Sequence, residues 1–447
     1  MVLAIVVATI SAGPAQAQAV AWPELAKVAE TTVDQLLAGE FAPVVARFNE
    51  KMRAAASEEF LKQTMASLTG QVGAFKARTG TRTDERQGIR LVIIGCEFER
   101  ASLDAQIAFD VQERIAGLSF RPQAVAAAEY EAPSYVNRAA FNDQEVVVDA
   151  GGWPLPGTLS VPAGTGPFPA VVLVHGSGQH DRDETIGPNR PFRDVAWGLA
   201  SRGIVVLRYI KRTREHQQRV AQVSATFTVK EEAIDDAVAA VALLRKRPEV
   251  QAGRIFVLGH SLGAMLAPRI AAADPRIAGL VLMAGPVRSI EQSIVDQVRY
   301  LTGVDGTISA DERSQIEMAD ALFAAVRDLK AGDPPIQSMF VSAPSSYWLD
   351  LRGYSAPEAS RALAQPMLVL QGERDYQVTM EDFAVWKKVL GEGGASPART
   401  VAYKSYPGLN HLFMPGMGPS TGAEYMQASH VAGEVIEDIA AWIKGQN

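Results

Sequence analysis

Leu258-Gly259-His260-Ser261-Leu262-Gly263-Ala264 is the stretch that decides the fold of this 447-residue chain. The run 254–257 before it has the pattern of a buried strand, and the small residues 265–273 after it favour a helix. Gly259, Ser261 and Gly263 fit G-x-S-x-G, a strand-turn-helix pattern that lifts a serine hydroxyl clear of a sheet. Glycine is needed because such a turn has strained backbone angles and close contacts. The alternative is a glycine-rich turn whose serine only caps the helix.

Buried strands alternate with helices from residue 143 to the end of the chain. A hairpin is predicted at 145–162, with its turn at Gly151-Gly152, and a continuous apolar strand at 168–174. Further strands are predicted at 205–209, 254–257, 277–284, 366–370 and 400–403, and helices at 194–201, 228–247 and 430–444. This alternation predicts an α/β domain at 143–447 with a doubly wound, mostly parallel sheet.

The strand rhythm disappears between residues 286 and 363. The pairs Ser289/Gln292 and Ser309/Glu312 are spaced as capping boxes and predict two helix starts. Roughly 75 residues far exceed an ordinary connection of about 4–6 residues, so we expect a helical cap over the serine. Some of its side chains are candidates for an apolar pocket, although such residues more often form the cap's own core. These candidates are Met339, Phe340, Tyr347, Trp348 and Tyr354.

A second, smaller domain is predicted at 23–122. Its apolar residues repeat at helical spacing up to Phe75, and strands with polar turns between them are predicted from residue 89 to 120. Helices followed by an antiparallel meander indicate a small α+β domain, with a linker at 123–142. With its ending at 117–122, the domain resembles the small cystatin-like or nuclear-transport-factor-like domains that precede some bacterial hydrolases. We expect it to serve packing, substrate access or homodimer formation.

The charge of the chain and its first residues restrict the partners and the compartment that we expect. A net charge of -7 and a pI near 5.6 give no electrostatic reason to expect nucleic acid or a membrane as partner. The basic clusters Lys211-Arg212-Arg214 and 245–247 are expected to be solvated faces. Residues 1–17 are predicted to be a signal peptide, because the apolar run 2–10 is followed by small residues and by Ala15-Gln16-Ala17, a pattern that suits cleavage before Gln18. This predicts a periplasmic or secreted protein, or a cytoplasmic one if that run, which no Lys or Arg precedes, is not a signal. The single cysteine, Cys96, is expected to be buried and inert.

With this turn, and with polar segments 175–178, 371–378 and 406–413 after three predicted strands, the chain resembles the α/β-hydrolases. Within that family it resembles the esterases of the prolyl-oligopeptidase and dienelactone-hydrolase branches. The resemblance implies a triad in the chain order Ser, acid, His. Ser261 is then the nucleophile and Asp375 the acid, with Glu373 as the alternative. His411 is the general base, and His430 is expected to be a helix or solvent-facing residue.

The resemblance also implies an oxyanion hole, in which backbone N–H groups bind the negative charge that develops on the substrate carbonyl. One donor is the N–H of Leu262. The other is expected from His175-Gly176-Ser177-Gly178, with Ser177 preferred and Gly178 next. A metal site formed by His175, His180, Asp181 and Asp183 is the alternative for this loop, although the spacing matches no strong ligand pattern.

These residues predict a serine hydrolase that cleaves carboxylic esters with short or medium acyl groups and needs no metal or cofactor. The expected partner is a small-molecule ester. A serine peptidase or amidase is the first alternative. A ligand-binding protein with an inert hydrolase domain is the second alternative, against which the complete triad argues.

Overall fold

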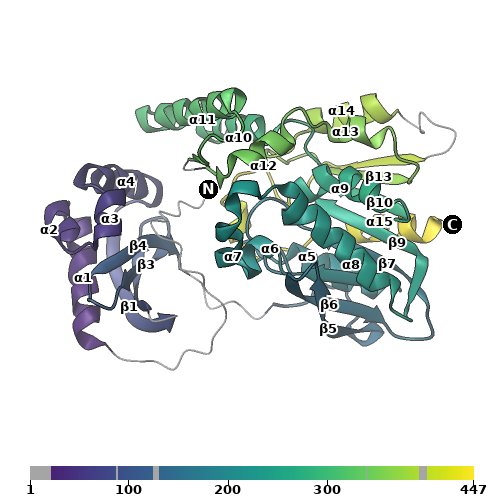
Figure 1. Ribbon diagram of the computed structural model, residues 1–447, viewed down its shortest axis with the longest axis horizontal. Helices are drawn as coiled ribbons and strands as arrows, with labels where there is room; N and C mark the ends of the chain where they lie inside the picture. The colour runs from purple at the N-terminus through teal and green to yellow at the C-terminus, as the bar shows by residue number, and fades with distance from the viewer. Residues whose placement is uncertain (1–21, 87–88, 124–129, 339, 392–399, 447) are drawn as a thin grey trace. The chain divides into compact units, whose positions relative to one another are not determined.

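A computed structural model describes residues 22–86, 89–123, 130–338, 340–391 and 400–446. The chain divides into two compact units, Met1–Ala128 and Glu129–Asn447 (Figure 1). The predicted signal peptide at 1–17, part of the predicted linker and the cap residue Met339 lie outside the described residues. Among the helices of the described ranges, none is long and apolar enough to cross a membrane.

The N-terminal unit packs short helices on one antiparallel sheet with the strand order β1-β2-β3-β4. Its elements are α1 (Pro23–Leu37), α2 (Phe41–Ala46), α3 (Glu50–Ala55), α4 (Glu58–Val72), β1 (Phe75–Arg86), β2 (Ile89–Phe98), β3 (Ser102–Phe109) and β4 (Ile115–Pro122). Strand β1 is absent from the sequence prediction. It lies at the edge of the sheet with mostly exposed side chains, so its sequence lacks the apolar alternation that marks a half-buried strand.

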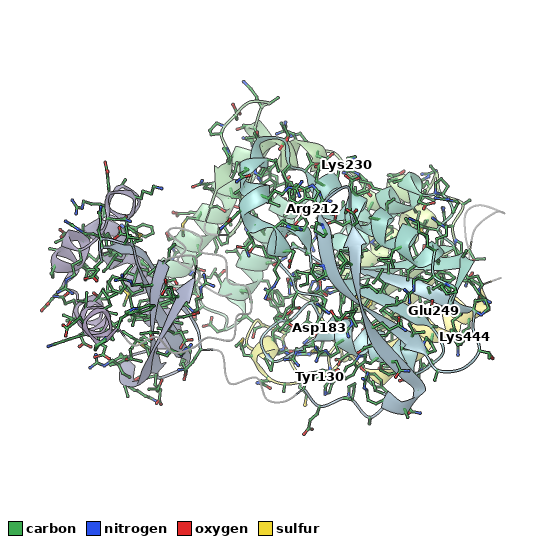
Figure 2. The ribbon with its side chains drawn as sticks, turned by 60° about the horizontal axis from the view of Figure 1, so that its bottom comes forward. Tyr130, Asp183, Arg212, Lys230, Glu249 and Lys444 are labelled. Atoms are coloured by element: carbon green, nitrogen blue, oxygen red, sulfur yellow. The ribbon has the colours of Figure 1, made fainter. Side chains whose placement is uncertain are left out.

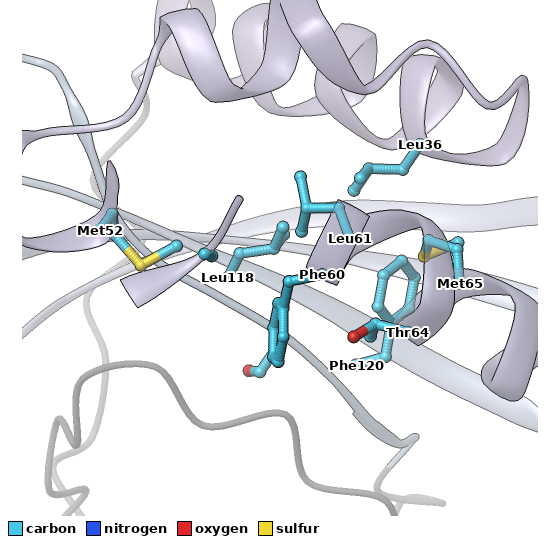
Figure 3. Close-up of a pocket in the computed structure, with 10 residues that line it drawn as sticks. Leu36, Met52, Phe60, Leu61, Thr64, Met65, Leu118 and Phe120 are labelled. Carbon is cyan, nitrogen blue, oxygen red and sulfur yellow. The ribbon is translucent and has the colours of Figure 1, made fainter. Parts of the chain in front are cut away.

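The core of this unit lies between the helices and the sheet. Alternate residues of β2, Val92, Ile94 and Cys96, are fully buried in it. Burial raises the pKa of the Cys96 thiol to about 11, which fits the expected inert thiol. An apolar hollow opens on this core (Figure 3). It is lined by Leu36, Met52, Ala56, Phe60, Leu61, Thr64, Met65, Leu118, Ser119 and Phe120.

The second unit is built on a sheet with the order β14-β13-β10-β9-β7-β8-β6-β5. Its strands are β5 (Phe141–Asp149), β6 (Pro154–Pro162), β7 (Phe168–Val174), β8 (Val205–Tyr209), β9 (Val250–His260), β10 (Gly279–Met283), β13 (Met367–Gly372) and β14 (Val401–Tyr406). Only the pairings β5–β6 and β6–β8 are antiparallel among these strands. The predicted mostly parallel, doubly wound sheet is confirmed.

Helices cover both faces of this sheet (Figure 1). On β7, Ala170 and Val172 face one apolar cluster, which α8, α9 and α14 share, whereas Val171 and Leu173 face the other, which α5 and α15 share. This two-sided burial explains why the parallel strands are continuously apolar. The helices of this unit outside residues 286–363 are η1 (Arg138–Ala140), α5 (Pro191–Ala200), α6 (Arg212–Glu215), α7 (Gln217–Gln222), η2 (Ser224–Thr226), η3 (Lys230–Ile234), α8 (Asp235–Arg245), α9 (Leu262–Ala273), α14 (Met380–Leu390), η4 (Glu424–Met426) and α15 (Gly433–Gly445).

Residues 286–363, here called the inserted segment, join β10 to β13. They form α10 (Ile290–Gly303), α11 (Ala310–Asp328), β11 (Ile336–Gln337), β12 (Ser342–Ala343), α12 (Ser345–Leu351) and α13 (Ala356–Ser360). Ser309 and Glu312 make a complete capping box, whereas Ser289 supplies only the serine half of one. Trp348 is buried in an apolar cluster made by the inserted segment itself. The aromatic side chain therefore serves the core of this segment.

The turn from β9 into α9 depends on direct contact between backbones. A Cβ atom on Gly259 would lie 2.2 Å from the Gly263 carbonyl oxygen, and one on Gly263 would lie 2.2 Å from the carbonyl oxygen of Val174 in β7. Any side chain at either position would push α9 away from the sheet.

Replacing Gly259 by alanine is expected to lower the free energy of unfolding by about 1–3 kcal/mol or more, because backbone atoms cannot yield to the added methyl group. Gly253→Ala is the matched control, since Gly253 lies in the same strand and a Cβ there meets nothing within 4 Å. Urea unfolding of both variants measures the difference. Equal stability of the two variants would contradict the close contact.

Candidate active site

The predicted site residues follow the carboxyl ends of four strands. Ser177 follows β7, Ser261 follows β9, Asp375 follows β13 and His411 follows β14. Because these four strands are parallel, their carboxyl ends lie at one edge of the sheet. The chain order reverses between β7 and β9, which is where α/β sheets open a crevice for ligands.

Ser261 has a strained backbone, with φ 52° and ψ −116°. Such a conformation costs a non-glycine residue about 1–3 kcal/mol and clusters at functional sites. It is held by a hydrogen bond of 2.9 Å from the Ser261 N–H to the Met283 carbonyl of β10. The next residue, Leu262, begins α9, so its N–H has no partner within the helix. The serine therefore stands beside a backbone donor that the hydrogen bonds of α9 do not use.

The Asp375 carboxylate is buried and holds the His411 ring. His411 Nδ1 lies 2.6 Å from Asp375 Oδ2, while Oδ1 accepts hydrogen bonds from the backbone N–H groups of Gln377 (2.8 Å) and Val378 (3.0 Å). A carboxylate only accepts, so Nδ1 carries the proton and Nε2 of a neutral ring is left with a lone pair. The alternative acid, Glu373, instead accepts a hydrogen bond from Ser405 at 2.7 Å.

A tight turn carries His411 to this position. The Asn410 side chain accepts hydrogen bonds from the N–H groups of Leu412 (3.0 Å) and Met414 (3.2 Å). Gly372, at the end of β13, lies against the same turn, where a Cβ would meet the Asn410 carbonyl oxygen at 2.6 Å. The loops that carry the acid and the imidazole are thus packed backbone to backbone.

His260 ties the serine turn to the histidine turn. Among the contacts of the described residues there is no hydrogen bond from Ser261 to His411. The neighbouring His260 ring instead lies 4.8 Å from the His411 ring, and its Nε2–H donates to the His411 carbonyl oxygen at 3.0 Å. The turn that carries Ser261 and the turn that carries His411 are therefore joined by His260, which precedes Ser261 in the chain.

His260 is also paired with Glu184, which sequence reasoning missed. Its Nδ1 lies 2.9 Å from Glu184 Oε2, and neither atom makes a hydrogen bond to a third group among the described residues. Since Nε2 already donates, a neutral ring would turn the lone pair of Nδ1 toward the carboxylate. Burial is the largest single influence on the pKa of His260 and lowers it, but the Glu184 charge, together with the hydrogen bonds to Glu184 and to the His411 carbonyl, raises the pKa above its ordinary value. Burial is also the largest single influence on Glu184 and raises its pKa, but His260, with smaller contributions from His180 and His175, lowers the carboxyl pKa to about 2.

Glu184 belongs to the loop after β7 and has a positive φ of 52°. Its Oε1 accepts a hydrogen bond from the Gly176 N–H at 2.7 Å. The carbonyl oxygen of Ser177 accepts from His180 Nε2 at 2.7 Å. The Ser177 and Gly178 N–H groups donate to no other group in the described part of the chain, so both predicted donors remain available there. The local sequence signal for Glu184 is only that an acid follows Asp181-Arg182-Asp183.

The side chains of the alternative metal site have other partners. His175 Nε2–H donates to the Asp181 carbonyl at 2.9 Å, and Asp183 (Figure 2) pairs with Arg208 and Arg193. Across the described ranges, no three His, Cys, Asp or Glu side chains form a group that could hold a metal ion. This loop is held by hydrogen bonds and ion pairs between its own side chains and the sheet.

The expectation that Lys211 and Arg212 form a solvated face is wrong. Both side chains are buried. Lys211 pairs with Glu232 and Arg212 (Figure 2) pairs with Asp236, and these two acids lie four residues apart on one helical stretch. A short sequence motif cannot reveal partners that lie over twenty residues away. The prediction for His430 agrees with the structure. Its ring is partly exposed and pairs with Asp194, not with Asp375 or another predicted site residue.

The burial of His175 makes the stability of the folded protein depend on pH. Burial lowers its pKa to about 3, below the ordinary value of 6.5, so the folded protein keeps the ring neutral where the unfolded chain takes up a proton. Its contribution to stability is therefore complete above pH 6.5 and is lost as the pH falls toward 3, by up to about 1.4 kcal/mol per pH unit. Between pH 6 and 5, the free energy of unfolding measured with urea should therefore fall less in His175→Gln than in the wild type. An equal fall in the two proteins would contradict the lowered pKa of His175.

Comparison with known proteins identifies both units. The family described as "Alpha/beta hydrolase family" matches residues 171–419, and "Protein of unknown function (DUF3887)" matches residues 29–118. Esterase EstD of Thermotoga maritima is 37% identical over 411 residues, covering 92% of this chain and 93% of the relative.

Solved structures are similar to part of the chain at lower identity. Est1E from Butyrivibrio proteoclasticus is 15% identical over 68% of this chain and 98% of its own, with a TM-score of 0.43. An esterase from Pyrobaculum calidifontis is 19% identical over 68% of this chain and 85% of its own, with a TM-score of 0.44. These values do not bear on the narrower branch, which stays a prediction. The family match and the long alignment with EstD confirm the predicted hydrolytic enzyme: the chain belongs to the alpha/beta hydrolase family.

Proposed function

We propose that the chain is a serine esterase in which Ser261 is the nucleophile, His411 the general base and Asp375 the acid that orients the base. The observation that carries this assignment is the contact of 2.6 Å between His411 Nδ1 and the buried Asp375 carboxylate. It leaves Nε2 as the basic atom of the ring. Esterase activity is further supported by the 37% identity to a relative named as an esterase.

In the first half of the reaction, Ser261 Oγ attacks the ester carbonyl carbon while His411 Nε2 takes the hydroxyl proton. The carbonyl oxygen becomes an oxyanion, which the N–H groups of Leu262 and Ser177 stabilise. The carbon–oxygen bond to the alcohol then breaks, and His411 returns the proton to the leaving oxygen. Asp375 stabilises the imidazolium during this step without taking its proton.

In the second half, water replaces the alcohol. His411 removes a proton from water as the water oxygen attacks the acyl carbon. The proton then passes to Ser261 Oγ as the carboxylic acid product leaves. At the end of the second half, Ser261, His411 and Asp375 have the protons with which they began. The proposed reaction uses no cofactor.

The proposed substrates are carboxylic esters with short or medium acyl groups. Two of the aromatic residues considered for an acyl pocket make other contacts. Trp348 packs in the core of the inserted segment, and the Tyr354 hydroxyl donates to the Met265 carbonyl oxygen at 2.9 Å. Acyl preference is therefore best measured directly. An amidase is the competing proposal, and a panel of nitrophenyl esters and matching anilides separates the two.

Ser261→Ala is expected to lower kcat on a nitrophenyl ester by about 10⁴-fold or more, because the covalent intermediate cannot form. It should also abolish labelling by a fluorophosphonate. Ser57→Ala, a helix cap in the N-terminal unit, is the control and should retain both properties. Unchanged turnover in Ser261→Ala would refute the proposal.

Asp375→Asn is expected to lower kcat by about 10⁴-fold, because an amide at this position favours the wrong tautomer of His411. Glu373→Gln is the matched control for the alternative acid, and its kcat should stay close to that of the wild type. The reverse result would assign the role of the acid to Glu373.

A further inference from the structure

Lys211 is a buried cation that lies directly on the loop after β7. Its Nζ donates to the Gly176 carbonyl oxygen at 2.8 Å and lies 2.9 Å from Glu232 Oε1. Its backbone N–H also donates to the His180 carbonyl at 3.1 Å. Burying an ammonium group is costly unless it is paired and hydrogen-bonded, so this position needs both contacts.

The bond to Gly176 sets the direction of the next N–H. The Gly176–Ser177 peptide is trans, so its carbonyl and its N–H point in opposite directions. With the carbonyl on Lys211, the Ser177 N–H faces away from the lysine. Gly176 itself lies beside the serine, since a Cβ on Gly176 would be 3.2 Å from Ser261 Cβ.

The groups around this N–H are held by other side chains. The Gly176 N–H is bound by Glu184 and the Ser177 carbonyl by His180, so the peptide is fixed before and after the Ser177 N–H. A cation on the carbonyl also polarises the peptide and strengthens its N–H as a donor. Both effects favour binding of an anion at that N–H.

The inserted segment contacts this arrangement through Tyr347 of α12. Its hydroxyl donates to Glu232 Oε2 at 2.8 Å, while Glu232 Oε1 faces Lys211. Burial, followed by the Glu232 charge, raises the pKa of Tyr347 well above its ordinary value, so the hydroxyl keeps its proton. A continuous polar chain thus runs from Tyr347 through Glu232 and Lys211 to Gly176.

We propose that Lys211 is a positioning residue of the oxyanion hole, which holds and polarises the Gly176–Ser177 peptide so that the Ser177 N–H stabilises the tetrahedral intermediate. This role rests on the proposed function of Ser261. Lys211 contacts no reacting atom and acts only through the peptide. Its effect belongs to the transition state, where the oxyanion exists, and not to binding of the neutral ester.

The test compares Lys211→Met with Lys230→Met, a lysine with an exposed side chain. Both enzymes are titrated with a fluorophosphonate, so that kcat is expressed per reactive serine. In Lys211→Met, kcat on a nitrophenyl ester should fall by about 10- to 100-fold with KM changed less than about 3-fold. Lys230→Met should match the wild type.

An alkyl trifluoromethyl ketone gives the decisive measurement, because Ser261 adds to its carbonyl and forms a tetrahedral oxyanion. Its inhibition constant should rise by the same factor as kcat falls. A structural role alone would reduce the number of reactive serines and leave kcat per serine and the inhibition constant unchanged, which would overturn the proposal. If Lys211→Met does not fold, the same two measurements on Lys211→Gln decide in the same way.

The outcomes separate this inference from the proposed function. Loss of turnover and labelling in Ser261→Ala, together with wild-type constants in Lys211→Met, would refute only the role of Lys211. Turnover that persists in Ser261→Ala would refute the proposed function and this inference with it.

Discussion

The contact of Gly263 with the backbone of Val174 is the constraint on which the rest of this site depends. It sets the helix α9 against the end of β7 with no side chain between them. At that distance the Ser261 backbone must adopt its strained conformation, with Leu262 as the first residue of the helix. The same approach places Gly176 of the next loop beside Ser261. This arrangement is the basis on which we propose that two backbone donors from segments far apart in sequence serve one oxyanion.

Charge is buried around this contact in pairs. Glu184 and His260 form one pair, and Lys211 and Glu232 form another, and each pair also holds a backbone group of a loop at the site. An unpaired ion at these positions would carry a large desolvation penalty. The pairs therefore give the loops after β7 and β14 defined positions that a purely apolar surface could not specify. The imidazole of His411 is oriented in the same way by Asp375.

The sequence predicted the parts of this arrangement that follow the rhythm of the strands. Asp375 and His411 could be placed because each stands just after an apolar strand, and the structure pairs them. Glu184, His260 and Lys211 could not be given roles because their partners belong to other strands and helices. Lys211 in particular stands in a basic cluster that is typical of a surface. Its ion pair with Glu232, just before α8, is what allows it to be buried. Strand β1 was missed because its side chains are exposed on an edge.

By itself, the sequence determined the doubly wound sheet, the serine turn and the chain order of the acid and the imidazole. The sheet follows from local periodicity, the serine turn from the glycines of its motif, and the order of the acid and the imidazole from the resemblance to the α/β-hydrolases. The tertiary structure alone decided which polar groups meet at the ends of the strands. Hydrogen bonds such as that from Lys211 to Gly176 join residues 35 positions apart, and they form only after the sheet has brought its strand ends together. Burial then decides which of those charges are paired, because a buried charge without a partner is too costly to keep.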